Sequence, residues 1–171
     1  MTTEKHELRI ERVFDSPRQL VWNAWTRPEL LMQWWGPESF TSPICKVDLR
    51  VGGKYLYCMR SQDGTDYWSG GTYKEIVPLE KLVCVDAFAN EHGEKIDPTD
   101  YGFDPIFPKE NVVTITFQEV EGKTKVTVLY IVESEEVLEI MRNVQMKEGW
   151  ETSLDKIAKL LKNQSGGMGK E

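Results

Sequence analysis

Hydrophobic and polar residues alternate near the start of the chain, over residues 7–14. Leu8, Ile10 and Phe14 fall on one face of this segment, and Arg9 falls on the other. A repeat of two residues is typical of a strand with one buried face. The pattern therefore predicts that the fold opens with a strand.

Two short helices are expected next. Ser16 is placed to cap the first helix, with Pro17 at its first position and Gln19 at its third, which is the arrangement of a capping box. Pro28 disfavours a helical conformation for the preceding residue, so the first helix should end there and a second one begin. Gly-Pro at residues 36–37 should end the second helix.

A series of strands follows, separated mostly by short turns. Gly70 and Gly71 interrupt one of them and suggest a bulge or a sharp bend. Because the turns are short, an antiparallel meander is the simplest topology. The six expected strands cover residues 44–49, 54–60, 67–77, 81–88, 111–119 and 125–132.

The segment of residues 89–110 is different, because prolines and glycines exclude a regular element. A loop of this length inside a domain is usually functional or disordered. Tyr101, Phe103, Ile106 and Phe107 make it too apolar for simple disorder. We expect a packed lid.

The chain should close with one long amphipathic helix, for which Ser134 is the expected cap. Its apolar residues recur every three or four positions, which is the spacing of a single buried stripe. Residues 1–164 are expected to form one domain, and residues 165–171, with three glycines, a disordered tail. The stripe consists of Met146, Trp150, Leu154, Ile157 and Leu161.

Together these elements predict an α+β helix-grip fold. In it, a curved antiparallel sheet of about seven strands wraps around the long C-terminal helix, and two short helices follow the first strand. A sheet that grips one helix leaves a space between them, and ligands commonly bind in such spaces.

Composition and charge narrow the function. A net charge of −7 disfavours binding to nucleic acid or to an anionic membrane. The three cysteines form no C-x-x-C pair and the two histidines are far apart, so we expect no metal and no cofactor. No segment is apolar enough to be a signal peptide or a membrane span, so we expect a soluble cytoplasmic protein, either a monomer or a homodimer.

Several motifs, in order along the chain, resemble one known family. They include Arg12-Val13-Phe14-Asp15-Ser16-Pro17, Trp34-Trp35-Gly36-Pro37, Val47-Asp48-Leu49-Arg50-Val51-Gly52-Gly53, Gly71-Thr72-Tyr73-Lys74-Glu75-Ile76 and Gly149-Trp150. Together they resemble the homologues of the activator of heat-shock-protein-90 ATPase, within the birch-pollen-allergen-like and START-like superfamily. The resemblance covers roughly residues 8–161 and implies a helix-grip fold with an internal cavity. It does not imply one chemistry, because relatives include lipid carriers, cyclases and co-chaperone domains.

Aromatic residues with polar tips dominate the strands expected to line this cavity, where a solid core would use Leu, Ile and Val. For Trp34-Trp35-Gly36-Pro37, the structural interpretation is that Trp34 packs under the sheet while Gly36-Pro37 turns the chain, and the functional one places Trp35 at the mouth of a pocket. The expected lining residues are Trp35, Tyr55, Tyr57, Met59, Trp68, Tyr73, Asp86, Phe88, Tyr101, Phe103, Phe107, Trp150 and Leu154.

Asp86 shares a strand face with Leu82 and Cys84, so it is the carboxylate to consider as a general base. The competing interpretation is a solvated strand end. A catalytic carboxylate needs a partner and a perturbed pKa, and no spacing in the sequence indicates either. We therefore predict no catalytic residues.

Three functions fit the sequence. The first is a binding protein for a small apolar or aromatic ligand. The second, which rests on the family resemblance, is a protein-interaction module with a chaperone-linked partner; the eukaryotic namesake carries this domain beside another one, for which this chain has no room. The third is a small enzyme of the cyclase or hydrolase type.

Overall fold

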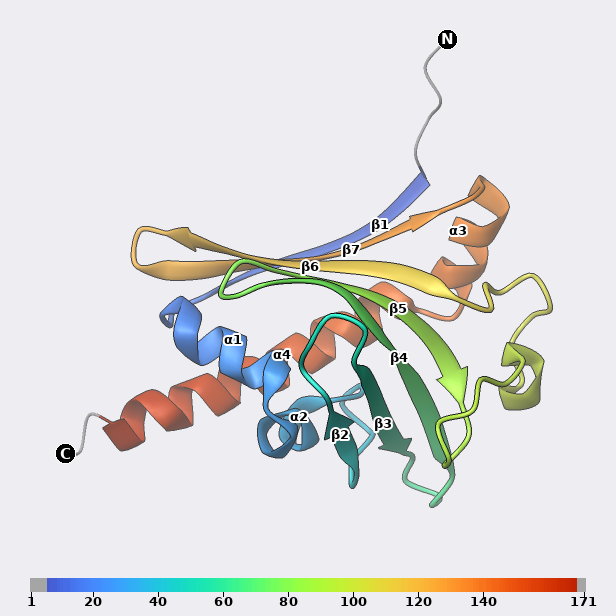
Figure 1. Ribbon diagram of the computed structural model, residues 1–171, viewed down its shortest axis with the longest axis horizontal. Helices are drawn as coiled ribbons and strands as arrows, with labels where there is room; N and C mark the ends of the chain where they lie inside the picture. Colours follow the sequence, from blue (N-terminus) through green and yellow to red (C-terminus); the bar gives the residue numbers. More distant parts are fainter. Residues whose placement is uncertain (1–5, 169–171) are drawn as a thin grey trace, which may run out of the picture.

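Seven antiparallel strands form one sheet in the computed structural model, which describes residues 6–168 (Figure 1). The order across the sheet is β1-β7-β6-β5-β4-β3-β2, so consecutive strands from β2 to β7 are neighbours and β1 adds to the β7 edge. The strands are β1 (His6–Phe14), β2 (Cys45–Val47), β3 (Lys54–Arg60), β4 (Asp66–Val77), β5 (Lys81–Ala89), β6 (Asn111–Val120) and β7 (Lys123–Val132).

The long helix α4 lies across the concave side of this sheet, and α1 and α2 lie on the same side (Figure 1). The helix-grip architecture expected from the sequence is therefore confirmed. The helical elements are α1 (Arg18–Thr26), α2 (Pro28–Trp34), the 3-10 turn η1 (Pro98–Tyr101), α3 (Glu135–Asn143) and α4 (Met146–Met168). None of the helices in the described part of the chain is long and apolar enough to cross a bilayer.

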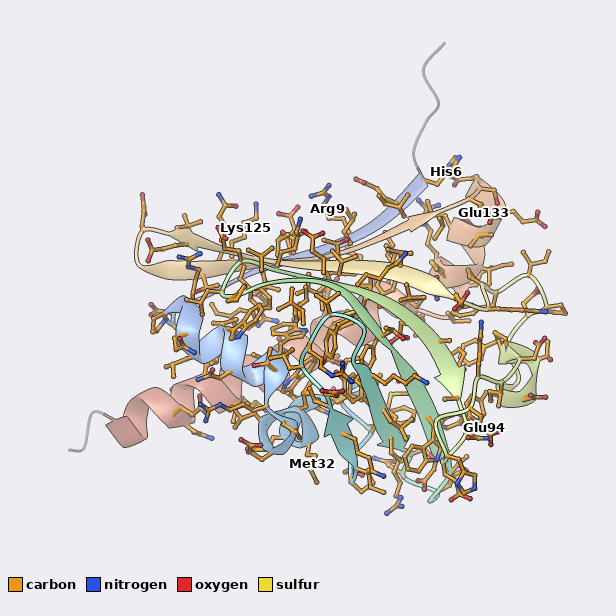
Figure 2. All side chains as sticks on the ribbon, viewed as in Figure 1. His6, Arg9, Met32, Glu94, Lys125 and Glu133 are labelled. Carbon is orange, nitrogen blue, oxygen red and sulfur yellow. The ribbon has the colours of Figure 1, made fainter. Side chains whose placement is uncertain are left out.

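The outer face of the sheet carries charged side chains. Figure 2 shows Arg9 and Lys125 pointing away from the helices. Lys125 lies 2.7 Å from the carboxylate of Glu11, and Arg9 lies 3.4 Å from that of Glu7. This face is therefore solvated on β1 and β7. Most apolar residues of these strands are buried on the other face, whereas Val13 and Ile131 are each 52% exposed.

Helix α1 begins later than the capping box predicts. Pro17, with ψ of 154°, is the cap itself, and no side chain caps the helix. Ser16 is instead buried, and its carbonyl accepts a 2.7 Å hydrogen bond from the hydroxyl of Thr124. This bond ties the residue before the helix to β7, so the chain stays extended through Pro17.

The C-terminal region is two helices rather than one. Ser134 caps α3 as expected, because its hydroxyl accepts from the amide of Val137 at 3.3 Å. The chain then turns at Gln145, whose φ is +58°, before α4 begins. Helix α4 continues to Met168 and so enters the segment 165–171, for which disorder is expected; residues 169–171 lie outside the described residues.

The apolar stripe of α4 has two halves. Leu154, Ile157 and Leu161 are at most 2% exposed and form solid core against the sheet. Trp150 and Met146, one and two turns before Leu154, are only partly buried. The same helix is therefore fully packed towards its C-terminal half and loosely packed at its start.

Two strand details differ from expectation. The first strand of the meander is only three residues, Cys45–Val47, because the chain before it runs as a loop to the next contact with β3. The irregularity in β4 lies between Tyr73 and Glu75, not at the glycine pair.

Candidate functional site

A cavity of about 260 Å³ lies between the concave face of the sheet and the start of α4. Residues from α1, α2, five strands, the β5–β6 loop and the α3–α4 junction surround it. Its volume is slightly below the roughly 300–1,000 Å³ of typical small-molecule sites. Among the lining residues, Val144 and Gln145 are the exposed ones, so the cavity reaches solvent at the α3–α4 junction.

Three tyrosines from two adjacent strands form one wall. The rings of Tyr55 and Tyr57 are stacked with centroids 4.8 Å apart, and Tyr73 lies 5.1 Å from Tyr55. These residues are 1–6% exposed. The rings make most of this wall apolar, and the hydroxyl at the end of each ring adds a polar atom.

Two tryptophans form a second wall, which adjoins the first at Tyr57. Trp35, immediately after α2, lies 4.6 Å from the ring of Tyr57 and 5.8 Å from that of Trp150 on α4. The indole N–H of Trp150 donates to the hydroxyl of Tyr130 at 3.0 Å. Trp34, in contrast, is 1% exposed and donates to the carbonyl of Ala24 at 2.8 Å, so it also closes the core beneath the cavity.

The loop that carries Trp35 is fastened to α4. The ammonium of Lys156 donates to the carbonyls of Gly36, Pro37 and Phe40 at 2.8–3.0 Å. Burial lowers the pKa of this ammonium. These bonds fix the tryptophan wall relative to the helix.

The β5–β6 loop supplies the last side of the cavity. The rings of Phe88 and Phe103 stack at 4.7 Å, and Phe107, 5% exposed, lies 4.9 Å from Phe103. Tyr101 anchors this loop, because its hydroxyl donates to the carbonyl of Ala89 at 2.6 Å. The loop is thus packed as expected, although Ile106 is 45% exposed and takes no part.

Asp86 places a carboxyl group in this aromatic enclosure. The hydroxyl of Tyr55 donates to its Oδ2 at 2.7 Å, and the side chain lines the cavity. Burial raises the pKa of Asp86 to about 7, although the hydrogen bond from Tyr55 opposes the rise. The interpretation of Asp86 as a solvated strand end is therefore wrong.

Gly71 makes the contact between Tyr55 and Asp86 geometrically accessible. Gly71 is on β4, the strand between β3 and β5, where it is paired with Tyr55 on β3 and with Asp86 on β5. A Cβ atom at Gly71 would lie 2.5 Å from the Tyr55 hydroxyl and 2.1 Å from the carbonyl oxygen of Val85. Only a residue without a side chain lets the tyrosine ring cross this strand.

Two further polar groups in the wall make no hydrogen bond with the described protein atoms. They are the hydroxyl of Tyr73 and the indole N–H of Trp25. Both residues are at most 3% exposed and line the cavity. A buried polar group without a partner costs about 1–3 kcal/mol, so such groups are uncommon in solid cores.

Most of the residues expected from the sequence line the cavity. Three do not: Trp68 lies on the opposite face of β4, paired with Cys58, Tyr101 anchors the loop, and Leu154 is solid core. Those that line it are Trp35, Tyr55, Tyr57, Met59, Tyr73, Asp86, Phe88, Phe103, Phe107 and Trp150.

The sequence reasoning missed a second set of lining residues. For Tyr67, the alternation along β4 contained the signal, since it points to the same face as Tyr73. The α3–α4 junction carries no such signal in the sequence, because no glycine or proline marks the break between the two helices. The missed residues are Trp25, Trp34, Gly36, Pro37, Tyr67, Leu82, Cys84, Val113, Ile115, Tyr130, Val144, Gln145, Met146, Gly149 and Ser153.

The chemistry available to the cavity is narrow. Within residues 6–168, no group of three or more His, Cys, Asp or Glu side chains is arranged to hold a metal ion. Asp86 is the one charged side chain among the described residues of the wall. The site is thus an apolar enclosure with one carboxyl group and a few neutral polar atoms.

Solved structures share this fold over nearly the whole chain. A solution structure of a protein from Arthrobacter aurescens is 26% identical, with a TM-score of 0.78, and the match covers 95% of this chain and 93% of that one. The crystal structure of protein NE0264 from Nitrosomonas europaea is 24% identical, with a TM-score of 0.76 and coverage of 94% and 96%. The AHSA1 protein from Silicibacter pomeroyi is 20% identical, with a TM-score of 0.70 and coverage of 93% and 99%.

No curated protein matches this sequence. A family model does, over residues 15–162, and its description is "Activator of Hsp90 ATPase homolog 1-like protein". The match extends from the residue before Ser16 through most of α4, and includes every residue of the cavity wall. The chain therefore belongs to the family of Activator of Hsp90 ATPase homolog 1-like proteins.

Proposed function

We propose that this protein binds a small, largely aromatic molecule in the cavity between the sheet and α4. The observation that carries the proposal is a cavity of about 260 Å³ whose wall consists mainly of aromatic and aliphatic side chains and contains one carboxyl group, that of Asp86. Aromatic faces supply contact area, and the few polar atoms supply orientation. Family membership is compatible with this role and does not specify it.

Gly149 supports the proposal independently. It lies in the first turns of α4, where glycine costs about 1 kcal/mol relative to alanine. Neither a bend nor a close approach explains it: the chain turns earlier, at Gln145, and the nearest atom to a Cβ at Gly149 would be 3.5 Å away, in Pro37. Because Gly149 lines the cavity one turn after its exposed edge, its missing side chain keeps the opening wide.

A pair of substitutions at Gly149 tests whether the cavity binds ligands. Gly149→Ala should stabilise the protein by about 1 kcal/mol through helix propensity and leave binding of a neutral aromatic probe, 1-naphthylmethanol, nearly unchanged. Gly149→Leu should be similarly helical, but its side chain should occupy the opening and weaken binding at least about tenfold. Binding is measured by isothermal titration calorimetry, and stability by urea unfolding.

The alanine variant is the matched control, because it changes the backbone preference without filling the space. Equal loss of binding in both variants would mean that Gly149 matters for helix geometry and not for access. If 1-naphthylmethanol and a wider panel of fatty acids, sterols and flavonoids all fail to bind the wild type, the cavity is not a ligand site. An interaction module with a chaperone-linked partner would then be the better proposal.

An acid–base enzyme is a weaker explanation of the same site. Asp86 has a pKa suited to proton transfer near neutral pH. Its hydrogen-bond partner Tyr55, however, stays neutral, because burial and the nearby carboxyl raise its pKa well above the ordinary value, and its hydroxyl donates to Asp86 itself and not to a substrate. We therefore place binding before catalysis.

A further inference from the structure

Asp86 has no cationic partner. It takes part in none of the ion pairs of the described residues, and no lysine, arginine or histidine is among the described residues of the cavity wall. The hydrogen bond from the Tyr55 hydroxyl occupies its Oδ2 and leaves Oδ1 for another donor. A carboxylate enclosed by protein without a countercharge is costly, and a cation that enters the cavity would relieve that cost.

The walls around this carboxyl are made of aromatic rings. Tyr55 contacts it directly, Tyr57 and Tyr73 lie within 5.1 Å of Tyr55, and Trp35 lies 4.6 Å from Tyr57. The face of an aromatic ring carries negative electrostatic potential and attracts cations, most strongly where water is excluded. Carboxylate and ring faces thus favour the same sign of ligand charge.

We propose that the ligand is a small aromatic amine, whose ammonium group lies against Asp86 and whose rings pack against the tyrosine and tryptophan side chains of the cavity wall. This inference rests on the proposed binding function and specifies its ligand class. The net charge of −7 also favours the approach of a cation. A fatty acid or another carboxylate is disfavoured, because its charge would face Asp86.

The pH dependence of binding follows from the groups that face Asp86. Tyr55 from β3, Cys84 from β5 and Tyr130 from β7 all have raised pKa values, so they remain neutral between pH 5 and pH 8. Asp86 is the group that changes charge in that range. An ammonium ligand should therefore bind well at pH 8 and lose affinity as Asp86 becomes protonated at lower pH.

The experiment compares three probes of one shape: 1-naphthylmethylamine, 1-naphthylmethanol and 1-naphthylacetic acid. Dissociation constants are measured by calorimetry at pH 8 and pH 5.5 for the wild type and two variants. At pH 8 the amine should bind about tenfold or more tightly than the alcohol, and the acid should bind most weakly. The preference for the amine should shrink at pH 5.5 and disappear in Asp86→Asn.

Asp15→Asn is the matched control, because it removes one negative charge at an exposed position outside the cavity wall. It should keep the preference for the amine. If the alcohol binds and the amine is no better in the wild type, the amine inference is wrong and the proposed function stands. If the Asp15 variant loses the preference as fully as the Asp86 variant, net charge and not the site explains it, which also overturns the inference. If no probe binds, the proposed function itself fails.

Discussion

Asp86→Asn should make the protein more stable at pH 8, by up to about 4 kcal/mol. The asparagine keeps an oxygen that can accept from Tyr55 and removes the charge that burial disfavours. The magnitude follows from the rise in the pKa of Asp86 from 3.8 to about 7, since each pH unit corresponds to about 1.4 kcal/mol. Urea unfolding at a series of pH values, followed by tryptophan fluorescence, measures it.

The sign is fixed by the direction of the pKa shift. Between pH 4 and pH 7 the folded protein keeps the Asp86 proton and the unfolded chain has lost it, so the stability contributed by this group falls as the pH rises. Above about pH 7 both states are ionised and the full cost is present. Below pH 4 both are protonated, and wild type and variant should differ little.

The difference between the two proteins isolates Asp86 from other carboxylates. Hydrogen bonds lower the pKa values of Asp63, Asp66 and Asp97. The stability that these carboxylates contribute to the folded protein therefore decreases as the pH falls, and it does so equally in the wild type and the variant. A variant that is less stable than the wild type at pH 8 would contradict the account. Such a result would mean that the charged carboxylate has a partner that stabilises it.

Gly71→Ala should destabilise the protein by about 3 kcal/mol or more, which is at the upper end of the cost of overpacking. The new methyl group would lie 2.1 Å from the carbonyl oxygen of Val85, a backbone atom of the neighbouring strand that cannot move without breaking the ladder. It would also displace the ring of Tyr55 from Asp86. Urea unfolding at pH 7 gives the loss of stability.

Gly70→Ala is the matched control on the same strand. Its Cβ would lie 3.0 Å from the carbonyl oxygen of Tyr55 and 3.4 Å from the side chain of Leu56, distances that small adjustments can relieve. Its cost should be clearly smaller. Equal costs at both positions would show that the two glycines are needed for backbone flexibility and not for the passage of the tyrosine ring.

The order of elements could be predicted because each carries a local signal. Alternation marks β1 through residues 8 to 14, and the paired turn residues mark the hairpins. The break between α3 and α4 could not, because Gln145 adopts a left-handed conformation that the sequence does not announce with glycine or proline. That turn places Met146 and Trp150 in the cavity wall.

The aromatic wall could likewise be predicted from strand periodicity. The residues that were expected in the wall but lie elsewhere have physical explanations. The aromatic character of Trp68 favours a place in the cavity, whereas the structure puts its neighbour Tyr67 on the inner face of β4 and Trp68 on the outer one. Leu154 lies on the correct face of α4 but one turn beyond the open part of the cavity, in solid core. The side-chain types indicate that a pocket exists. Where the pocket ends along α4 depends on how closely the helix packs against the sheet, which the sequence does not show.

The pairing of Tyr55 with Asp86 was beyond sequence reasoning. These residues are 31 positions apart, and they meet only because β3, β4 and β5 are in a register that puts Gly71 between them. A single-residue change of that register would send the two side chains to opposite faces. The perturbed pKa of Asp86 depends on this three-strand arrangement.

The most direct test of the central claim, that the cavity binds a small aromatic molecule, is an NMR titration of the tryptophan indole N–H signals with 1-naphthylmethanol. Of the six tryptophans, Trp25, Trp34, Trp35 and Trp150 line the cavity, and Trp22 and Trp68 lie outside its wall. The account predicts saturable shifts with one dissociation constant, largest at Trp35 and Trp150, and none at Trp22 or Trp68. Shifts confined to Trp68, or no saturable shift at any of the four cavity tryptophans, would contradict it.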